Sequence, residues 1–180
     1  LKYIGEYALV SYTIISYVNT IVVMSMAGIA QGTQPLISYY YGKNESEKYK
    51  KLLKYGMVAA AAGSVAAVLI CYVGAESIVG LFLKESEASL SVYSVRVLRI
   101  FILSFLLAGL NVVLGGYFTS VEKAGFATMI SLTRSLIALV ISLVFLTAVF
   151  GGEAIWWAPL IAESCCLVLS AGLYQWYRKK

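Results

Sequence analysis

The sequence lacks histidine and aspartate altogether, and charged residues make up only 13% of its 180 positions. The absence of histidine excludes, within these residues, a His-ligated metal site, an imidazole proton relay and a Ser-His-Asp hydrolase triad. The three cysteines lie inside apolar stretches, at a spacing that matches no metal-binding pattern. We therefore expect no metal, no cofactor and no enzymatic activity.

Hydrophobic residues are the abundant class, at 61% of the chain with a mean hydropathy of +0.84. A soluble domain carries about 45–50% apolar residues and about 25% charged ones. A chain this apolar buries its surplus apolar surface against lipid rather than in a single core. Its net charge of +5 comes from basic residues in short connections, without the aromatic-interleaved basic stripe of a nucleic-acid-binding protein. We expect membrane lipids as partners and no nucleic acid.

Five stretches are long and apolar enough to cross a bilayer, which takes about 20 residues of helix. Their apolar residues are continuous rather than alternating, so they predict helices and not strands. The predicted fold is an all-α integral membrane protein, a polytopic bundle of about five transmembrane helices that forms one domain over residues 1–180. Because the chain begins with Leu1 rather than Met, we expect a fragment of a longer chain. The predicted spans are 8–33, 55–75, 100–121, 132–150 and 155–177.

The basic residues predict how the bundle lies in the membrane. With five alternating spans, the connections 43–54 and 122–134 share one face with the tail 178–180. That face holds most of the Lys and Arg residues, which places it, and the carboxyl terminus, in the cytoplasm at the cell membrane. The basic residues on this face are Lys43, Lys48, Lys50, Lys51, Lys54, Lys123, Arg134, Arg178, Lys179 and Lys180.

Glu163 is an acidic residue near the middle of the last predicted span. An ionised side chain there costs about 2.5–3.5 kcal/mol on insertion scales, so it should face the interior and be paired, hydrogen-bonded or protonated. Its candidate partners are Asn19, Asn111 and the tyrosine hydroxyls of the first span. Two roles remain open for it, the coupling of transport to a proton or cation and a neutral hydrogen bond between helices.

The first span carries polar residues on one helical face. Tyr12, Ser16 and Asn19 follow one another at spacings that place side chains on the same side of a helix. Such a stripe faces either a water-filled cavity or a neighbouring helix to which it hydrogen-bonds. With Glu163 and Asn111, these three residues form the predicted ion-coupling or substrate cavity.

Three runs of residues resemble motifs of the multidrug and toxic compound extrusion (MATE) family. Residues 28–42, which read GIAQGTQPLISYYYG, resemble the end of the second helix of each half of such a protein. Residues 154–163 resemble the segment that opens the last helix. Residues 116–123, with 131–134 after them, are similar to the connection between the tenth and eleventh helices. The resemblance implies helices eight to twelve, most of the C-terminal six-helix bundle, with the N-terminal half of the same chain as the missing partner.

The resemblance also implies a function, secondary active multidrug efflux. Such a transporter exports small amphipathic organic cations by alternating access, in antiport with H⁺ or Na⁺. Gln31, Gln34 and Pro35 are the predicted gate or hinge, because proline removes a backbone donor and can kink a helix. The alternative is a proline that is simply tolerated near a helix end.

We expect two further residues, Gly42 and Arg134, to maintain the cytoplasmic surface, with Arg134 pairing with Glu122 or with carbonyl groups. A direct role of Arg134 in transport is the alternative. The chain departs from the family pattern at Ala108, where some sodium-coupled members carry an acidic residue, and at Glu163, where aspartate is common. Two other functions stay open, a flippase for lipid-linked oligosaccharides of the same superfamily and a non-transporting scaffold subunit of a membrane assembly.

Overall fold

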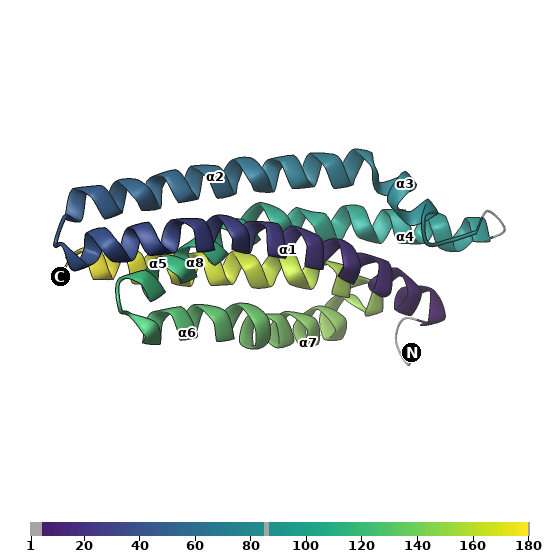
Figure 1. The fold of residues 1–180 in the computed structure, drawn as a ribbon. Coiled ribbons are helices and arrows are strands. Elements are labelled where there is room, and N and C mark those ends of the chain that lie inside the picture. The colour runs from purple at the N-terminus through teal and green to yellow at the C-terminus, as the bar shows by residue number, and fades with distance from the viewer. Residues whose placement is uncertain (1–4, 85–86, 180) are drawn as a thin grey trace.

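The computed structural model describes residues 5–84 and 87–179, which fold almost entirely into helices that lie side by side along one axis (Figure 1). Within these two ranges no residue is in a β-strand. Among the described residues, five continuous helical stretches are long and apolar enough to cross a membrane. The predicted all-α class and polytopic bundle are therefore confirmed. The main helices are α1 (Gly5–Gly42), α2 (Ser46–Val73), α4 (Ala88–Phe101), α5 (Phe105–Ser120), α6 (Ala124–Leu132), α7 (Ala138–Phe150) and α8 (Ala158–Lys179).

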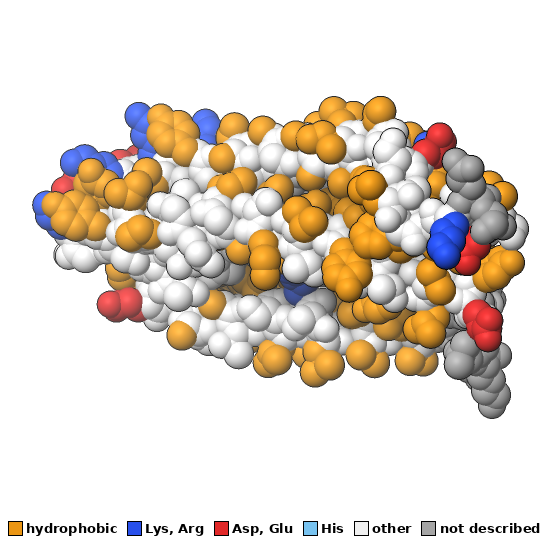
Figure 2. All heavy atoms as spheres, turned by 45° about the vertical axis from the view of Figure 1, so that its right-hand side comes forward, with side chains coloured by type: hydrophobic (Ala, Val, Ile, Leu, Met, Phe, Trp, Pro, Cys, Tyr) orange, Lys and Arg blue, Asp and Glu red, His pale blue; other side chains and the backbone are white. Residues whose placement is uncertain are grey.

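Short segments join these helices into the five spans. A 3-10 turn at Ile102–Ser104 links α4 to α5, and a π-helical turn at Thr133–Ile137 links α6 to α7. The 3-10 segment Gly152–Trp157 leads into α8, and the short helix α3 (Ala75–Gly80) follows α2. The α1–α2 turn, the α5–α6 turn and the end of α8 lie together at the left of Figure 1. We call this the basic end, because Figure 2 shows Lys and Arg side chains gathered there.

Helix α5 is the centre of the bundle. It contacts α1, α2, α6 and α8, and α8 in turn contacts α7. In the span that α5 forms with α4, 56% of the most apolar stretch is buried, against 22–33% in the other spans. Its buried aromatic side chains, Phe105, Tyr117 and Phe118, belong to two hydrophobic clusters, one toward each end of the molecule. The other spans are therefore arranged around α5.

The outward faces of the peripheral helices are apolar. On α2, Ile70 is 70% exposed, and on α7 both Ile141 and Val144 are 63% exposed. Hydrophobic side chains cover the flank of the molecule between its two charged ends (Figure 2). A surface this apolar is stable in hydrocarbon. The backbone N–H and C=O groups of a helix hydrogen-bond to one another there, so they need no water.

All five spans are longer than the sequence predicts, and the first, third and fourth differ most. α1 continues through Pro35 to Gly42. The third span begins at Ala88 rather than near residue 100, because α4 buries an apolar face while Arg96 on its other side stays exposed. The fourth begins at Ala124 rather than near residue 132, so that Arg134 lies within the span.

Gly109 marks the closest approach of α5 to its neighbours. A Cβ atom added there would lie 2.5 Å from Ser64 Oγ, 3.0 Å from Met26 Sδ and 3.3 Å from the Ala60 carbonyl oxygen. These neighbours belong to α1 and α2. Small residues allow membrane helices to pack this closely, and the contact at Gly109 joins three spans at one point.

We therefore predict that Gly109→Ala destabilises the protein although alanine is the better helix former. Overpacking typically costs about 1–3 kcal/mol. The midpoint of thermal unfolding in detergent should fall for this variant. Gly172→Ala is the matched control, because nothing lies within 4 Å of a Cβ added at Gly172 of α8. Equal midpoints for Gly109→Ala and Gly172→Ala would contradict the predicted close packing.

A buried ion pair in a membrane cavity

A cavity of about 560 Å³ lies between α1 on one side and α7 and α8 on the other. Figure 2 shows the hollow between these groups of helices, with a basic side chain inside it. The walls are mainly apolar and aromatic, interrupted by hydroxyl and amide groups and by one carboxylate and one guanidinium. The polar lining consists of Tyr12, Ser16, Asn19, Ser104, Ser131, Arg134, Ser135 and Glu163, and the apolar lining includes Val23, Phe101, Ala108, Leu139, Leu143, Ile155, Trp156, Pro159 and Ala162.

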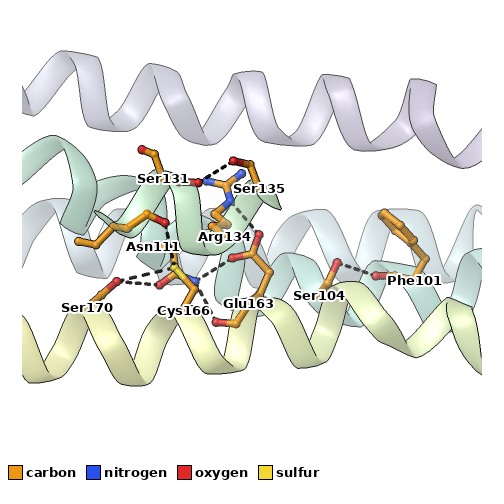
Figure 3. A network of polar contacts seen from close by, with 10 residues as sticks. Phe101, Ser104, Asn111, Ser131, Arg134, Ser135, Glu163, Cys166 and Ser170 are labelled. Carbon is orange, nitrogen blue, oxygen red and sulfur yellow. Dashed lines mark hydrogen bonds and ion pairs between the residues drawn. The ribbon is translucent and has the colours of Figure 1, made fainter. Parts of the chain in front are cut away.

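Glu163 of α8 and Arg134 of the π-helical turn form an ion pair, with Arg134 Nε 2.9 Å from Glu163 Oε1. Asn111 of α5 donates from Nδ2 to Glu163 Oε2 at 2.7 Å and to the Glu163 carbonyl oxygen at 3.0 Å. Both carboxylate oxygens therefore have a partner, each from a different span (Figure 3). The predicted pairing of Glu163 with Asn111 is present in the structure.

Two members of the network, Glu163 and Asn111, are buried, and Arg134 is half-buried. Glu163 is 9% exposed, Asn111 is 1% exposed, and the Arg134 side chain retains 23% of its exposure. A lone buried charge costs several kcal/mol, whereas an opposite charge with good hydrogen bonds offsets much of that cost. Ser170 donates from Oγ to Asn111 Oδ1 at 3.4 Å, which helps to fix the amide with its donor toward Glu163. The pair leaves this part of the cavity with no net charge.

The local sequence explains how Arg134 reaches the cavity. It lies in the π-helical turn Thr133–Ile137, and such turns are rare inside α-helices and frequent at functional sites. Ser135 donates from Oγ to the Ser131 carbonyl oxygen at 2.6 Å on the same wall. Across the cavity, Ala108 lies one turn before Asn111 and contributes only a methyl group, which leaves volume beside the carboxylate.

The polar stripe of the first span lines the same cavity from the opposite wall. Ser16 and Asn19 are half-buried and Tyr12 is 58% exposed. The Ser16 hydroxyl donates to the Thr13 carbonyl oxygen at 2.8 Å. The Asn19 side chain hydrogen-bonds to no residue that the structure describes, so its amide is available to a ligand or to water. All five residues predicted for the cavity therefore contribute to its lining or, for Asn111, to the network behind it.

The predicted gate residues lie apart from this cavity. Gln31 and Pro35 are exposed on α1. Gln34 is half-buried and lines a smaller cavity of about 250 Å³, which it shares with Asn111 and Arg134. This smaller cavity lies toward the basic end of the ion-pair network, so Gln34 is the one gate candidate that faces the network.

One prediction about the surface is wrong. Arg134 pairs with Glu163 and not with Glu122, because α6 begins at Ala124 and carries Arg134 about 15 Å along the helix from that start. It lies in the cavity wall and not at the surface. Gly42 is exposed at the end of α1, and its role at the cytoplasmic surface stays a prediction.

The fold and the site together define a class, the polytopic α-helical membrane proteins with a polar cavity enclosed between spans. Within that class the assignment is specific. The MatE family model matches residues 1–144, which is most of the chain, and the chain belongs to this family. The prediction of a MATE family protein is therefore confirmed.

Individual relatives agree with this assignment. Over 166 residues the chain is 26% identical to the multidrug export protein MepA of Staphylococcus haemolyticus (strain JCSC1435), a match that covers 92% of this chain and 36% of MepA. The fold resembles that of a multidrug resistance MATE family transporter of the MOP superfamily in its outward-facing conformation, with a TM-score of 0.85, 18% identity and coverage of 97% of this chain and 39% of the other. The inward-facing conformation gives a TM-score of 0.81 at 17% identity, over 94% and 38% of the two chains.

We predict that breaking the ion pair from one side destabilises the protein more than removing both charges. Arg134→Gln leaves the Glu163 carboxylate buried without its cation, at a cost of about 3–5 kcal/mol. Adding Glu163→Gln should recover most of that loss, because neither charge then stays buried alone. Thermal unfolding in detergent of the two single variants and the double variant measures the coupling.

Arg96→Gln serves as the control for loss of one positive charge, because Arg96 is exposed on α4. Its unfolding midpoint should match the wild-type value. Strictly additive losses in the double variant would show that Arg134 and Glu163 do not stabilise each other.

Proposed function

We propose that this chain forms part of a secondary multidrug efflux transporter, which exports small amphipathic organic cations by alternating access in exchange for H⁺ or Na⁺. Family membership supports this proposal, since curated relatives include multidrug export proteins. The observation that carries it is the buried Glu163 carboxylate beside a cavity of about 560 Å³ with aromatic and apolar walls. We further propose that the five spans are helices eight to twelve of the transporter, as one domain over residues 1–180, and that the basic end is cytoplasmic.

The chemistry of the cavity suits an amphipathic cation. Phe101 and Trp156 offer aromatic surface, and a cation near an aromatic face gains about 0.5–2 kcal/mol. Trp156 donates from Nε1 to Tyr93 OH at 3.1 Å, which holds its ring in place. Leu139 and Leu143 add apolar surface on α7. The Glu163 carboxylate then supplies the one negative charge among the lining residues.

In this proposal, the Arg134 guanidinium competes with the transported or coupling cation for the Glu163 carboxylate. A coupling ion or an organic cation that binds the carboxylate must replace the guanidinium, which now occupies Oε1. The π-helical turn that carries Arg134 is the element that would move, together with Gln34 on the other wall of the smaller cavity. A cation shifts the equilibrium between two conformations only if it binds them with different affinity, and separation of Arg134 from Glu163 in one conformation would create that difference.

The cavity argues against the flippase alternative. A lipid-linked oligosaccharide is held to its lipid by phosphate groups, so its carrier needs net positive charge inside. The lining contains one guanidinium, and Glu163 neutralises it. A scaffold subunit would have no need of a hollow at this position.

We predict that Glu163→Gln abolishes ion-coupled efflux, because the amide can neither bind a cation by charge nor release a proton. The measurement is export of the fluorescent cation ethidium from cells that express the complete gene product, and from proteoliposomes under an imposed H⁺ or Na⁺ gradient. Glu122→Gln is the matched control, since Glu122 is exposed in the α5–α6 turn and should leave efflux unchanged.

The double variant Arg134→Gln/Glu163→Gln separates loss of function from loss of fold, because it contains no unpaired buried charge. It should remain stable and still fail to export. Wild-type efflux in Glu163→Gln would refute the coupling role of Glu163. A wild-type protein that moves no ethidium under either gradient would refute the proposed function.

A further inference from the structure

A second cavity, of about 530 Å³, lies at the basic end between α2, α6 and the last turns of α8. Its lining contains three basic side chains, Lys50, Lys123 and Arg178, and no acidic one. Cations from three separate segments of the chain therefore converge on one pocket. The rest of the wall is aromatic and consists of Tyr49, Tyr117, Phe126, Tyr174, Trp176 and Tyr177.

The aromatic walls are packed against one another across four helices. The ring centroid of Tyr117 on α5 lies 5.7 Å from that of Tyr174 on α8 and 6.5 Å from that of Tyr49 on α2. Phe126 of α6 lies 5.6 Å from Trp176 of α8. Because these contacts hold the helix ends together, the pocket has a defined shape, unlike a gap between mobile surface side chains.

The positive charge in this pocket is only partly offset by the protein. Neither Lys123 nor Arg178 forms an ion pair with any residue that the structure describes. Lys50 lies 3.8 Å from Glu47, whose side chain is 93% exposed and therefore solvated. An anion could enter the pocket without displacing a carboxylate. This is the reverse of the situation at Glu163, where the counter-charge is already in place.

The surroundings of the pocket indicate a lipid rather than a free anion. Tyr and Trp side chains at the ends of spans lie at the level of lipid headgroups. Below Phe126, on the same side of α6 and of its continuation, Met129, Leu132 and Leu136 are 48%, 48% and 57% exposed. Their positions follow Phe126 at three- and four-residue spacing, so they form one apolar row running from the pocket toward the membrane interior. A phosphate ion needs no such row, whereas a phospholipid tail does.

We propose that this pocket binds the phosphate-bearing headgroup of an anionic phospholipid, with an acyl chain along the row Met129, Leu132 and Leu136. Lys50, Lys123 and Arg178 meet the negative charge, and the tyrosine hydroxyls supply further donors. Basic pockets between membrane helices bind anionic headgroups in this way. The bound lipid joins α2, α6 and α8 at the end of the bundle. The proposal does not depend on the transported substrate.

The test compares two triple variants of the complete gene product that lose the same charge. The pocket variant carries Lys50→Gln, Lys123→Gln and Arg178→Gln. The matched control carries Lys43→Gln, Lys51→Gln and Lys54→Gln, which lie near the same end outside the pocket. Native mass spectrometry in detergent measures the dissociation constants for phosphatidylglycerol and phosphatidylcholine. We expect phosphatidylglycerol to bind at least about tenfold more weakly to the pocket variant, and within about twofold of wild type in the control.

Three results would overturn the proposal. The first is equal weakening in both triple variants, which would mean attraction by overall charge. The second is equal affinity of the wild-type protein for phosphatidylglycerol and phosphatidylcholine. The third is competition by soluble glycerol 3-phosphate at the same concentration as the lipid, which would identify a free-phosphate site. The single variant Lys123→Gln repeats the test with one surface change, in case the triple variant does not give monodisperse protein. Its phosphatidylglycerol affinity should also fall, and an unchanged value would count against the pocket.

Discussion

Hydrocarbon offers a polypeptide no hydrogen-bond partner and no screening of charge, and the arrangement of this bundle follows from that. The backbone satisfies itself in helices, and the apolar side chains of α2 and α7 face outward. Several polar side chains of the spans, among them Asn111, Glu163 and Ser170, are buried in the interior. The strictest case is the carboxylate of Glu163, which has a guanidinium on one oxygen and an amide on the other. Three different spans must meet for this to happen, so the ion pair links the packing of the bundle to the chemistry of its cavity.

The packing around α5 makes that meeting possible. Gly109 allows α5 to approach α1 and α2, and Asn111 lies half a turn further on and reaches the opposite way, toward α8. One short segment of α5 thus supports the helix core and the polar network together. The cavity lies on the side of α5 that faces α7. There α7 packs mainly against α8 and not closely against α5.

Much of this was predictable from the sequence because membrane helices leave a strong signal. Long apolar runs predicted five spans, and the isolated Glu163 predicted a buried acid with Asn111 among its partners. The stripe Tyr12, Ser16 and Asn19 predicted a polar face, though the sequence does not say which helix or cavity that face meets. The position of Arg134 in the cavity wall was not predicted, because the predicted span began near residue 132 and Arg134 was therefore assigned to the surface. The apolar run that precedes it, from Ala124 onward, was the available signal. The lining of the second cavity, at the basic end, could not be predicted either, because its basic residues come from segments far apart in sequence.

The neutrality of the Arg134–Glu163 pair has an electrical consequence. A membrane potential acts on net charge, at about 2.3 kcal/mol per elementary charge moved across 100 mV. Paired side chains that move together present only a dipole to that field, so the empty cavity has little reason to favour one orientation in an energised cell. In the proposed function, a monovalent cation that joins this site would add one positive charge to a neutral pair. The membrane potential would then act on the cation-loaded site and hardly at all on the Arg134–Glu163 pair alone.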